Sequence, residues 1–295
     1  MLRFASIDIG SNAIRMLFEQ VYETDNGPVF KKLTLVRLPV RLGEDAFVHG
    51  EISKDKEEKM LHIAHSFKHL SEVFEIDGYL ATATSAMRDS KNGIKIIDRI
   101  KNETGVKVKI IAGEEEAKIL YESIFNTGKI EKDKSYMFID VGGGSTEINF
   151  FVNGVRKKWK SFNIGTVRLK EGIQKESEWD RFDKWIKKNV DQFQPDFAVG
   201  TGGNINKLYK LCRLSDWENL ERAMLKSKIK YLSQFKPKQL INKLDIKSDR
   251  ADVIVPGGGI YLRAMEVAQI SEMIVPKVGL PDGLIRRLYF SSKKN

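Results

Sequence analysis

The sequence has one cysteine, Cys212, and no apolar run near the roughly 20 residues that a membrane span needs. A single cysteine excludes an intramolecular disulfide, so a reducing, cytoplasmic compartment is expected. The apolar residues at the start are interrupted by Asp8 and form too short a run for a signal peptide. Secretion and membrane insertion are therefore disfavoured.

Several nucleotide and nucleic-acid signatures are also missing. The glycine-rich turns are not followed by the Lys of a P-loop, and each continues into a strand, whereas a dinucleotide fingerprint continues into a helix. The sequence has no zinc-finger spacing, no basic region joined to heptads and no aromatic RNA-binding signature. Nucleic acid is therefore a disfavoured partner.

The composition is that of a packed protein with two domains, at 295 residues, 41% hydrophobic and 31% charged. Its net charge of +10 is distributed unevenly. Residues 1–125 hold 18 basic and 20 acidic side chains, whereas residues 126–295 hold 32 basic and 20 acidic ones. An excess of this size in one half suggests a polyanionic ligand, although a solvated Lys-rich surface is the plain alternative.

One short unit occurs twice in the chain. Residues 7–12 and 139–146 each read as a short apolar strand ending in Asp, followed by a turn of small residues and a second strand. Asp8 and Asp140 are 132 residues apart, close to half of the chain. The repeat predicts a duplicated architecture with a cleft between the halves.

Strands and helices alternate along the rest of the chain, which predicts α/β domains. We expect helices over 54–74, 93–104 and 114–125, and strands over 29–38, 79–84, 106–112, 197–201 and 253–256. The expected domains are residues 1–125 and 126–295, with a polar boundary near 126–134 and a last helix able to pack back on the first domain.

The two turns suit phosphate. Backbone N–H groups in a loop of Gly, Ser and Asn can form an anion-binding concavity, although one such turn alone could be a plain hairpin. The expected phosphate-binding residues in the turns are Gly10, Ser11, Asn12, Gly142, Gly143, Gly144 and Ser145. Asp8 and Asp140 would repel phosphate unless a cation such as Mg²⁺ lies between, so both are expected metal ligands.

Three further side chains are candidates. Glu147 follows the second turn and is expected to orient a metal or water. Glu116 is the candidate base for an attacking water, although acids in a first helical turn, such as Glu114, also stabilise the helix dipole. Arg88 could clamp phosphate oxygens, whereas Arg15 could simply face solvent.

Other reactive side chains are expected to be inert. His62, His65 and His69 share a helical face, but without paired carboxylates at ligand spacing they are read as an ordinary surface. Cys212 has no His partner in sequence and is expected to fill the core.

Taken in order, these motifs resemble the exopolyphosphatase / guanosine pentaphosphate phosphatase family of the actin, sugar-kinase and heat-shock-chaperone ATPase superfamily. The resemblance covers nearly the whole chain in its short two-domain form. It rests on residues 7–12 (IDIGSN), 41–44 (RLGE), 83–89 (ATSAMRD), 112–117 (AGEEEA), 140–147 (DVGGGSTE), 165–169 (GTVRL), 199–203 (VGTGG) and 256–259 (PGGG). In longer relatives further helical domains follow; their absence before Asn295 makes strong processivity doubtful.

The resemblance implies two ribonuclease-H-like, actin-like α/β domains flanking a catalytic cleft, and Mg²⁺-dependent release of terminal phosphate by water. The family's catalytic base corresponds to Glu116 and its second functional glutamate to Glu147, which is also expected to bind the metal. The turn residues and Arg88 carry over as phosphate ligands. Residues 281–282 (PD) replace the usual Arg-Glu, which puts a basic contact there in doubt.

The leading hypothesis is a phosphoanhydride hydrolase acting on inorganic polyphosphate, guanosine pentaphosphate or both. Two alternatives stay open: a non-catalytic sensor that binds polyphosphate or an alarmone, and a small-molecule kinase of the same superfamily. The sequence leaves chain-length preference, the number of metal ions and a homodimer open.

Overall fold

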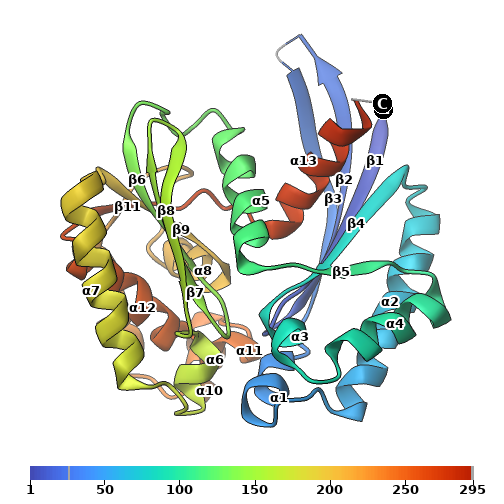
Figure 1. The fold of residues 1–295 in the computed structure, drawn as a ribbon, viewed down its shortest axis with the longest axis horizontal. Helices are drawn as coiled ribbons and strands as arrows, with labels where there is room; N and C mark the ends of the chain where they lie inside the picture. The colour runs from blue at the N-terminus through green and yellow to red at the C-terminus, as the bar shows by residue number, and fades with distance from the viewer. Residues whose placement is uncertain (26, 294–295) are drawn as a thin grey trace. The chain divides into compact units, whose positions relative to one another are not determined.

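Two mixed β-sheets organise the structure, a computed structural model that describes residues 1–25 and 27–293 (Figure 1). Contacts within the chain divide it into two units. Unit 1 comprises Met1–Ser123 and Gly279–Asn295, and unit 2 comprises Ile124–Val278. The C-terminal segment therefore belongs to the same unit as the N-terminus.

Unit 1 is a five-stranded sheet with helices on both faces. Its strands, in the order β3-β2-β1-β4-β5, are β1 (Leu2–Ile9), β2 (Ile14–Thr24), β3 (Gly27–Leu38), β4 (Gly78–Ala83) and β5 (Val108–Ile110). Its helices are α1 (Leu42–Val48), α2 (Lys54–Val73), α3 (Ser85–Asp89), α4 (Gly93–Thr104), α5 (Gly113–Phe125), whose last two residues lie in unit 2, and α13 (Leu280–Ser292). β2 runs antiparallel to β1, whereas β4 and β5 continue parallel to it.

The apolar spacing of the sequence explains how this sheet is covered. In α2, Met60, Ala64 and Phe67 recur at helical intervals and are buried against one face. On the other face, Ile285 and Tyr289 of α13 pack with Phe4 of β1, and Figure 1 shows α13 lying along β1 and β2. Because both faces are covered, six consecutive residues of β1 are buried, as in a central strand.

Unit 2 holds a six-stranded sheet in the order β10-β11-β9-β6-β7-β8. The strands are β6 (Ser135–Val141), β7 (Thr146–Val152), β8 (Val155–Phe162), β9 (Phe197–Thr201), β10 (Leu220–Glu221) and β11 (Glu272–Ile274). The helices are α6 (Thr166–Lys170), α7 (Glu176–Phe193), α8 (Gly203–Leu211), α9 (Arg222–Leu232), α10 (Pro237–Leu244), α11 (Ser248–Ala251) and α12 (Ile254–Val267).

The two sheets repeat one topology. In each, a hairpin of two antiparallel strands is followed by a third antiparallel strand on one side and by parallel strands on the other. β1, β2, β3 and β4 of unit 1 correspond to β6, β7, β8 and β9 of unit 2. The predicted fold class, α/β with two domains of duplicated architecture, is confirmed.

One predicted strand is wrong. Residues 253–256 were expected to be extended, but α12 begins at Ile254 and includes them. Pro256 is tolerated because it lies in the first helical turn, where a backbone N–H has no helical partner. The glycines that follow give close packing, since a Cβ on Gly257 would lie 2.7 Å from the Asn204 amide and one on Gly258 would lie 2.8 Å from Ile229.

Candidate functional site

The hairpin between β1 and β2 carries the first predicted phosphate turn. The Gly10 N–H donates to the Ala13 carbonyl at 3.2 Å, which closes the turn. The Ser11 carbonyl accepts from the Gly43 N–H at 2.8 Å, and the Asn12 carbonyl accepts from the Arg41 N–H at 3.0 Å. The loop carbonyls are therefore bound to the segment that begins α1, which fixes the shape of the turn.

Asp8 lies one residue before the end of β1, opposite Arg15 on β2 and Thr82 on β4. Its Oδ2 accepts a hydrogen bond from Arg15 Nη1 at 2.9 Å. Burial raises the pKa of the Asp8 carboxyl, and the Arg15 guanidinium opposes that rise. Arg15, a weaker candidate that the sequence left open to facing solvent, is the ion-pair partner of a buried carboxylate.

Helix α3 links the first turn to the start of α5. Ser85 Oγ lies 2.8 Å from Ser11 Oγ, and Arg88 Nη1 donates to the Ile111 carbonyl at 3.1 Å. The Arg88 side chain is about one third exposed, at 33%. Glu116 follows in the first turn of α5, half-buried, with its N–H bonded to the Ala112 carbonyl at 3.0 Å. The predicted turn, Arg88 and Glu116 thus all belong to unit 1, and Arg88 contacts the chain two residues before the helix that carries Glu116.

The hairpin between β6 and β7 has the same closure, since the Gly142 N–H donates to the Ser145 carbonyl at 2.9 Å. The Gly143 carbonyl accepts from the Val167 N–H at 2.9 Å, and the Gly144 carbonyl accepts from Arg168 Nε at 2.7 Å. Among residues 1–25 and 27–293, the N–H groups of Gly143 and Gly144 donate to no protein acceptor. Donors in such a loop are available to an anion.

A neighbouring glycine makes this arrangement feasible. A Cβ on Gly165 would lie 2.3 Å from the Gly143 oxygen and 2.6 Å from the Gly144 backbone carbon. No rotation can relieve that clash, because the atoms belong to the backbone on both sides. Gly165 is thus required for the second turn to pack against α6.

Asp140 and Glu147 are direct neighbours across the β6–β7 ladder. Asp140 Oδ1 accepts a hydrogen bond from Thr201 Oγ1 at 2.8 Å. Glu147 is buried, and its Oε1 accepts from Ser161 Oγ at 2.7 Å. Directly opposed Cβ atoms lie about 4.5–5.5 Å apart, so two carboxylates here repel each other unless a cation or a proton intervenes.

Tyr261 of α12 contacts Thr201, the residue that donates to Asp140. Its hydroxyl donates to the Thr201 carbonyl, and burial, followed by the negative charge of Asp140, raises its pKa well above the usual value. Gly202, at φ 110°, leaves room for that hydroxyl, since a Cβ there would lie 3.0 Å from it. Tyr261 therefore holds the end of β9 that supports Asp140.

The repeated register shows how the two hairpins differ. Asp8 corresponds to Asp140 and Thr82 to Thr201, but the position opposite the aspartate holds Arg15 in unit 1 and Glu147 in unit 2. The residue opposite the aspartate is thus a guanidinium in unit 1 and a second carboxylate in unit 2.

This difference bears on the predicted metal. Mg²⁺ is typically bound by one or two carboxylates together with substrate phosphates and water, and the Asp140–Glu147 pair fits that donor set. Asp8, the third predicted ligand, already has Oδ2 paired with Arg15. Within the described part of the chain, no three His, Cys, Asp or Glu side chains form a ready-made metal site.

Sequence reasoning did not single out Ser85, Ser161 or Tyr261. Each acts through a contact with a residue 14 to 74 positions away, which no local spacing shows. Thr201 lies in the 199–203 motif, but nothing in the sequence assigns it a role.

Cys212 is half-buried against the unit 2 core, and burial raises the pKa of its thiol, which favours the inert form. No helix in the described ranges is long and apolar enough to cross a membrane.

Together these features define a duplicated α/β protein in which each unit carries a small-residue hairpin directly after an acidic strand end. Residues 20–291 match the Ppx/GppA phosphatase family, and the chain belongs to that family.

Three relatives illustrate what the chain is similar to. The chain is 30% identical over 285 residues to the bifunctional 3-dehydroquinate synthase/phosphatase of Fusobacterium nucleatum, covering 88% of this chain and 42% of that protein. It is 23% identical to exopolyphosphatase 1 of Mycobacterium tuberculosis, covering 97% and 88%. It is also 23% identical to guanosine-5'-triphosphate,3'-diphosphate pyrophosphatase of Vibrio parahaemolyticus, covering 99% and 60%. The chain thus spans less than half of the first relative and most of the second.

A solved structure gives the same family and fold. The crystal structure of the Aquifex aeolicus Ppx/GppA family member aligns with a TM-score of 0.79 at 26% identity, covering 99% of this chain and 98% of that one. The resemblance inferred from the motifs is confirmed at the level of family and fold.

Proposed function

We propose that this chain is a Mg²⁺-dependent hydrolase that releases terminal phosphate from inorganic polyphosphate, from guanosine pentaphosphate, or from both. The observation that carries the proposal is the pair of opposed carboxylates, Asp140 and Glu147, directly beside a glycine hairpin with available N–H donors. The names of two relatives, an exopolyphosphatase and a guanosine-5'-triphosphate,3'-diphosphate pyrophosphatase, support the substrate class.

Each residue has a defined task in this proposal. The two hairpins donate backbone N–H groups to phosphate oxygens, and Arg88 holds further oxygens. Asp140 and Glu147 would hold Mg²⁺, with Asp8 as the third predicted ligand; when bound, the ion would neutralise the charge that develops on the phosphate.

Glu116 is the proposed base. It accepts a proton from water as the water oxygen bonds to the terminal phosphorus, and the bond from that phosphorus to the bridging oxygen breaks. The products are orthophosphate and a chain one unit shorter. Glu116 lies in the first turn of α5, and Arg88 donates to the carbonyl of Ile111, two residues before that helix, which supports this assignment.

The test is phosphate release from polyphosphate, guanosine pentaphosphate and ATP, measured side by side with Mg²⁺ and with EDTA. Release from at least one of the first two substrates, lost in EDTA, is expected. Tight binding without release would instead favour a sensor, and ATP use that requires an acceptor would favour a kinase.

A further inference from the structure

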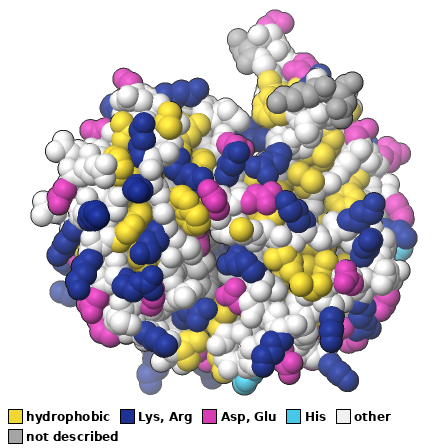
Figure 2. Space-filling model, in the orientation of Figure 1, with side chains coloured by type: hydrophobic (Ala, Val, Ile, Leu, Met, Phe, Trp, Pro, Cys, Tyr) yellow, Lys and Arg dark blue, Asp and Glu magenta, His cyan; other side chains and the backbone are white. Residues whose placement is uncertain are grey.

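Strand β8 carries four basic residues in a run of five, with Trp159 among them and no acidic residue. These four, Arg156, Lys157, Lys158 and Lys160, are called the β8 basic strip. Lys157 and Lys158 are exposed, and over the described ranges Lys157, Lys158 and Lys160 form no ion pair. Figure 2 shows Lys and Arg side chains gathered over the side of unit 2 on which Figure 1 places β8. Such a surface concentrates anions.

The strip begins at the candidate site. Ser161, which pairs with Glu147 on β7 and donates a hydrogen bond to it, directly follows Lys160. Lys160 itself pairs with Ile148 and lies on the other face of the sheet. A strand rises about 3.3 Å per residue, so Lys157 lies roughly 13 Å along β8 from Ser161. The basic residues are therefore spread along β8 at increasing distance from Ser161, over a length that several linked phosphate groups would span.

An irregularity in β8 places two of its side chains on the same sheet face as Glu147. Trp159 pairs with Asn149, and Arg156 pairs with Phe151, because the register shifts by one residue between them. The Arg156 guanidinium consequently lies 5.7 Å from the Trp159 ring centroid. With strict alternation, these two residues would lie on opposite faces.

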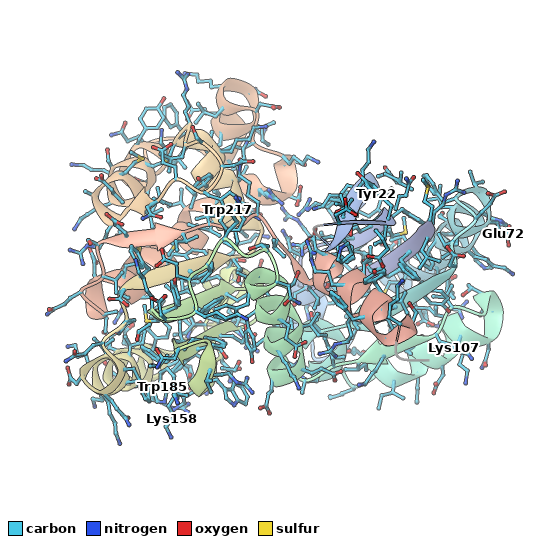
Figure 3. All side chains as sticks on the ribbon, turned by 90° about the horizontal axis from the view of Figure 1, so that it is seen from above. Tyr22, Glu72, Lys107, Lys158, Trp185 and Trp217 are labelled. Carbon is cyan, nitrogen blue, oxygen red and sulfur yellow. The ribbon has the colours of Figure 1, made fainter. Side chains whose placement is uncertain are left out.

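The remaining cations lie at the same edge. Lys158 pairs with Phe150, whose ring lies 5.7 Å from Trp185 of α7, so Lys158 lies on the α7 face. Figure 3 labels Lys158 and Trp185 at the same end of unit 2. β8 is the last strand in the order of its sheet and pairs with β7. An edge strand has backbone N–H groups that point outward, and a ligand lying along it can reach cations from both faces.

We propose that the β8 basic strip binds the distal part of a linear inorganic polyphosphate whose terminal phosphate is held at the hairpin beside Glu147. This inference rests on the proposed function. It assigns a substrate class, since a long polyphosphate reaches the strip whereas a short one ends at the hairpin. The three lysine charges of the strip and the edge donors match a ligand with a negative charge on every unit and no apolar part.

The test uses the full chain with Lys157→Gln and Lys158→Gln combined. The matched control, Lys129→Gln with Lys238→Gln, removes two exposed charges elsewhere in unit 2. Binding of labelled polyphosphate of about 100 units is measured at several NaCl concentrations in EDTA. Phosphate release from long polyphosphate and from tripolyphosphate is measured with Mg²⁺.

The double variant should bind long polyphosphate about three- to tenfold more weakly, since each exposed ion pair contributes a small factor. The slope of log K against log salt should fall in magnitude by about 1 to 2, and tripolyphosphate turnover should be unchanged. The control should match the wild type in every assay.

Three results would overturn the proposal: unchanged binding of the long chain, an equal loss with tripolyphosphate, or equally tight and equally sensitive binding of single-stranded nucleic acid. If the wild type releases no phosphate but binds the long chain through the strip, the proposed function fails while the strip stands.

Discussion

The repeated register of the two sheets sets up a matched pair of substitutions, Thr201→Val and Thr82→Val. Both threonines lie beside the strand-end aspartate of their unit and both are buried. Thr201 Oγ1 donates to Asp140 at 2.8 Å, whereas Thr82 Oγ1 is buried with no hydrogen-bond partner among the described residues. Valine keeps the shape of threonine and suits a strand, so each change removes only the hydroxyl group.

The expected effects have opposite signs. Thr201→Val removes a hydrogen bond to a carboxylate, which contributes about 1.5–3 kcal/mol, so the free energy of unfolding should fall by that amount. Thr82→Val removes a buried hydroxyl that forms no bond, so the free energy of unfolding should stay the same or rise by about 1 kcal/mol.

Urea unfolding with a probe for each unit measures both changes. The refuting result is an equal effect of the two substitutions, in either direction. Equality would mean that the two threonines have the same surroundings, and hence that Asp140 is not held by Thr201.

Two further predictions follow from buried groups. Gly165→Ala should lower the free energy of unfolding by about 2–3 kcal/mol, since the new Cβ would lie 2.3 Å from the Gly143 oxygen. The control, Gly259→Ala, adds a Cβ with nothing within 4 Å and should not lower the free energy of unfolding. Denaturant curves that coincide for the two variants would contradict this prediction. Burial, followed by the negative charge of Asp282, raises the pKa of Glu19 to about 7. Because the folded protein keeps this proton to a higher pH than the unfolded chain does, the free energy of unfolding should fall by about 3 kcal/mol as the pH rises from about 4.5 to about 7. In Glu19→Gln this pH dependence should disappear, and a wild-type protein without it would refute the assignment.

Much of the fold follows from local patterns. The helix expected over 93–104 is α4, because Ile96, Ile97 and Ile100 recur at helical spacing and Gly105, at φ 78°, ends the helix in a left-handed conformation. The two Asp-containing strand ends predicted the duplication, which the shared strand order confirms.

Three features of the structure could not be predicted from the sequence, each for a physical reason. The 253–256 segment is apolar and precedes glycines, a pattern shared by a buried strand and by the first turn of a buried helix, so periodicity could not separate them. The Tyr261–Thr201 contact joins residues 60 positions apart and exists only once both elements pack. The pairing of Asp8 with Arg15 depends on a strand register that the residue types alone leave open.

The predicted roles of Glu116, Glu147 and Arg88, and the Mg²⁺ ion, stay predictions. Their local surroundings are nonetheless informative. Glu147 is buried opposite Asp140 with Ser161 as donor, and Arg88 contacts the residue two positions before α5. Each placement agrees with the expected chemistry without testing it.

The most direct test of the account compares phosphate release from polyphosphate by Glu116→Gln with release by Glu114→Gln, both with Mg²⁺. Each variant removes one negative charge from the first turn of α5, so effects on the helix dipole are matched. A general base contributes about 10²–10⁴-fold, so Glu116→Gln should lose at least a hundredfold in kcat while Glu114→Gln stays near the wild type. Equal turnover in the two variants would contradict the central claim that Glu116 deprotonates the attacking water.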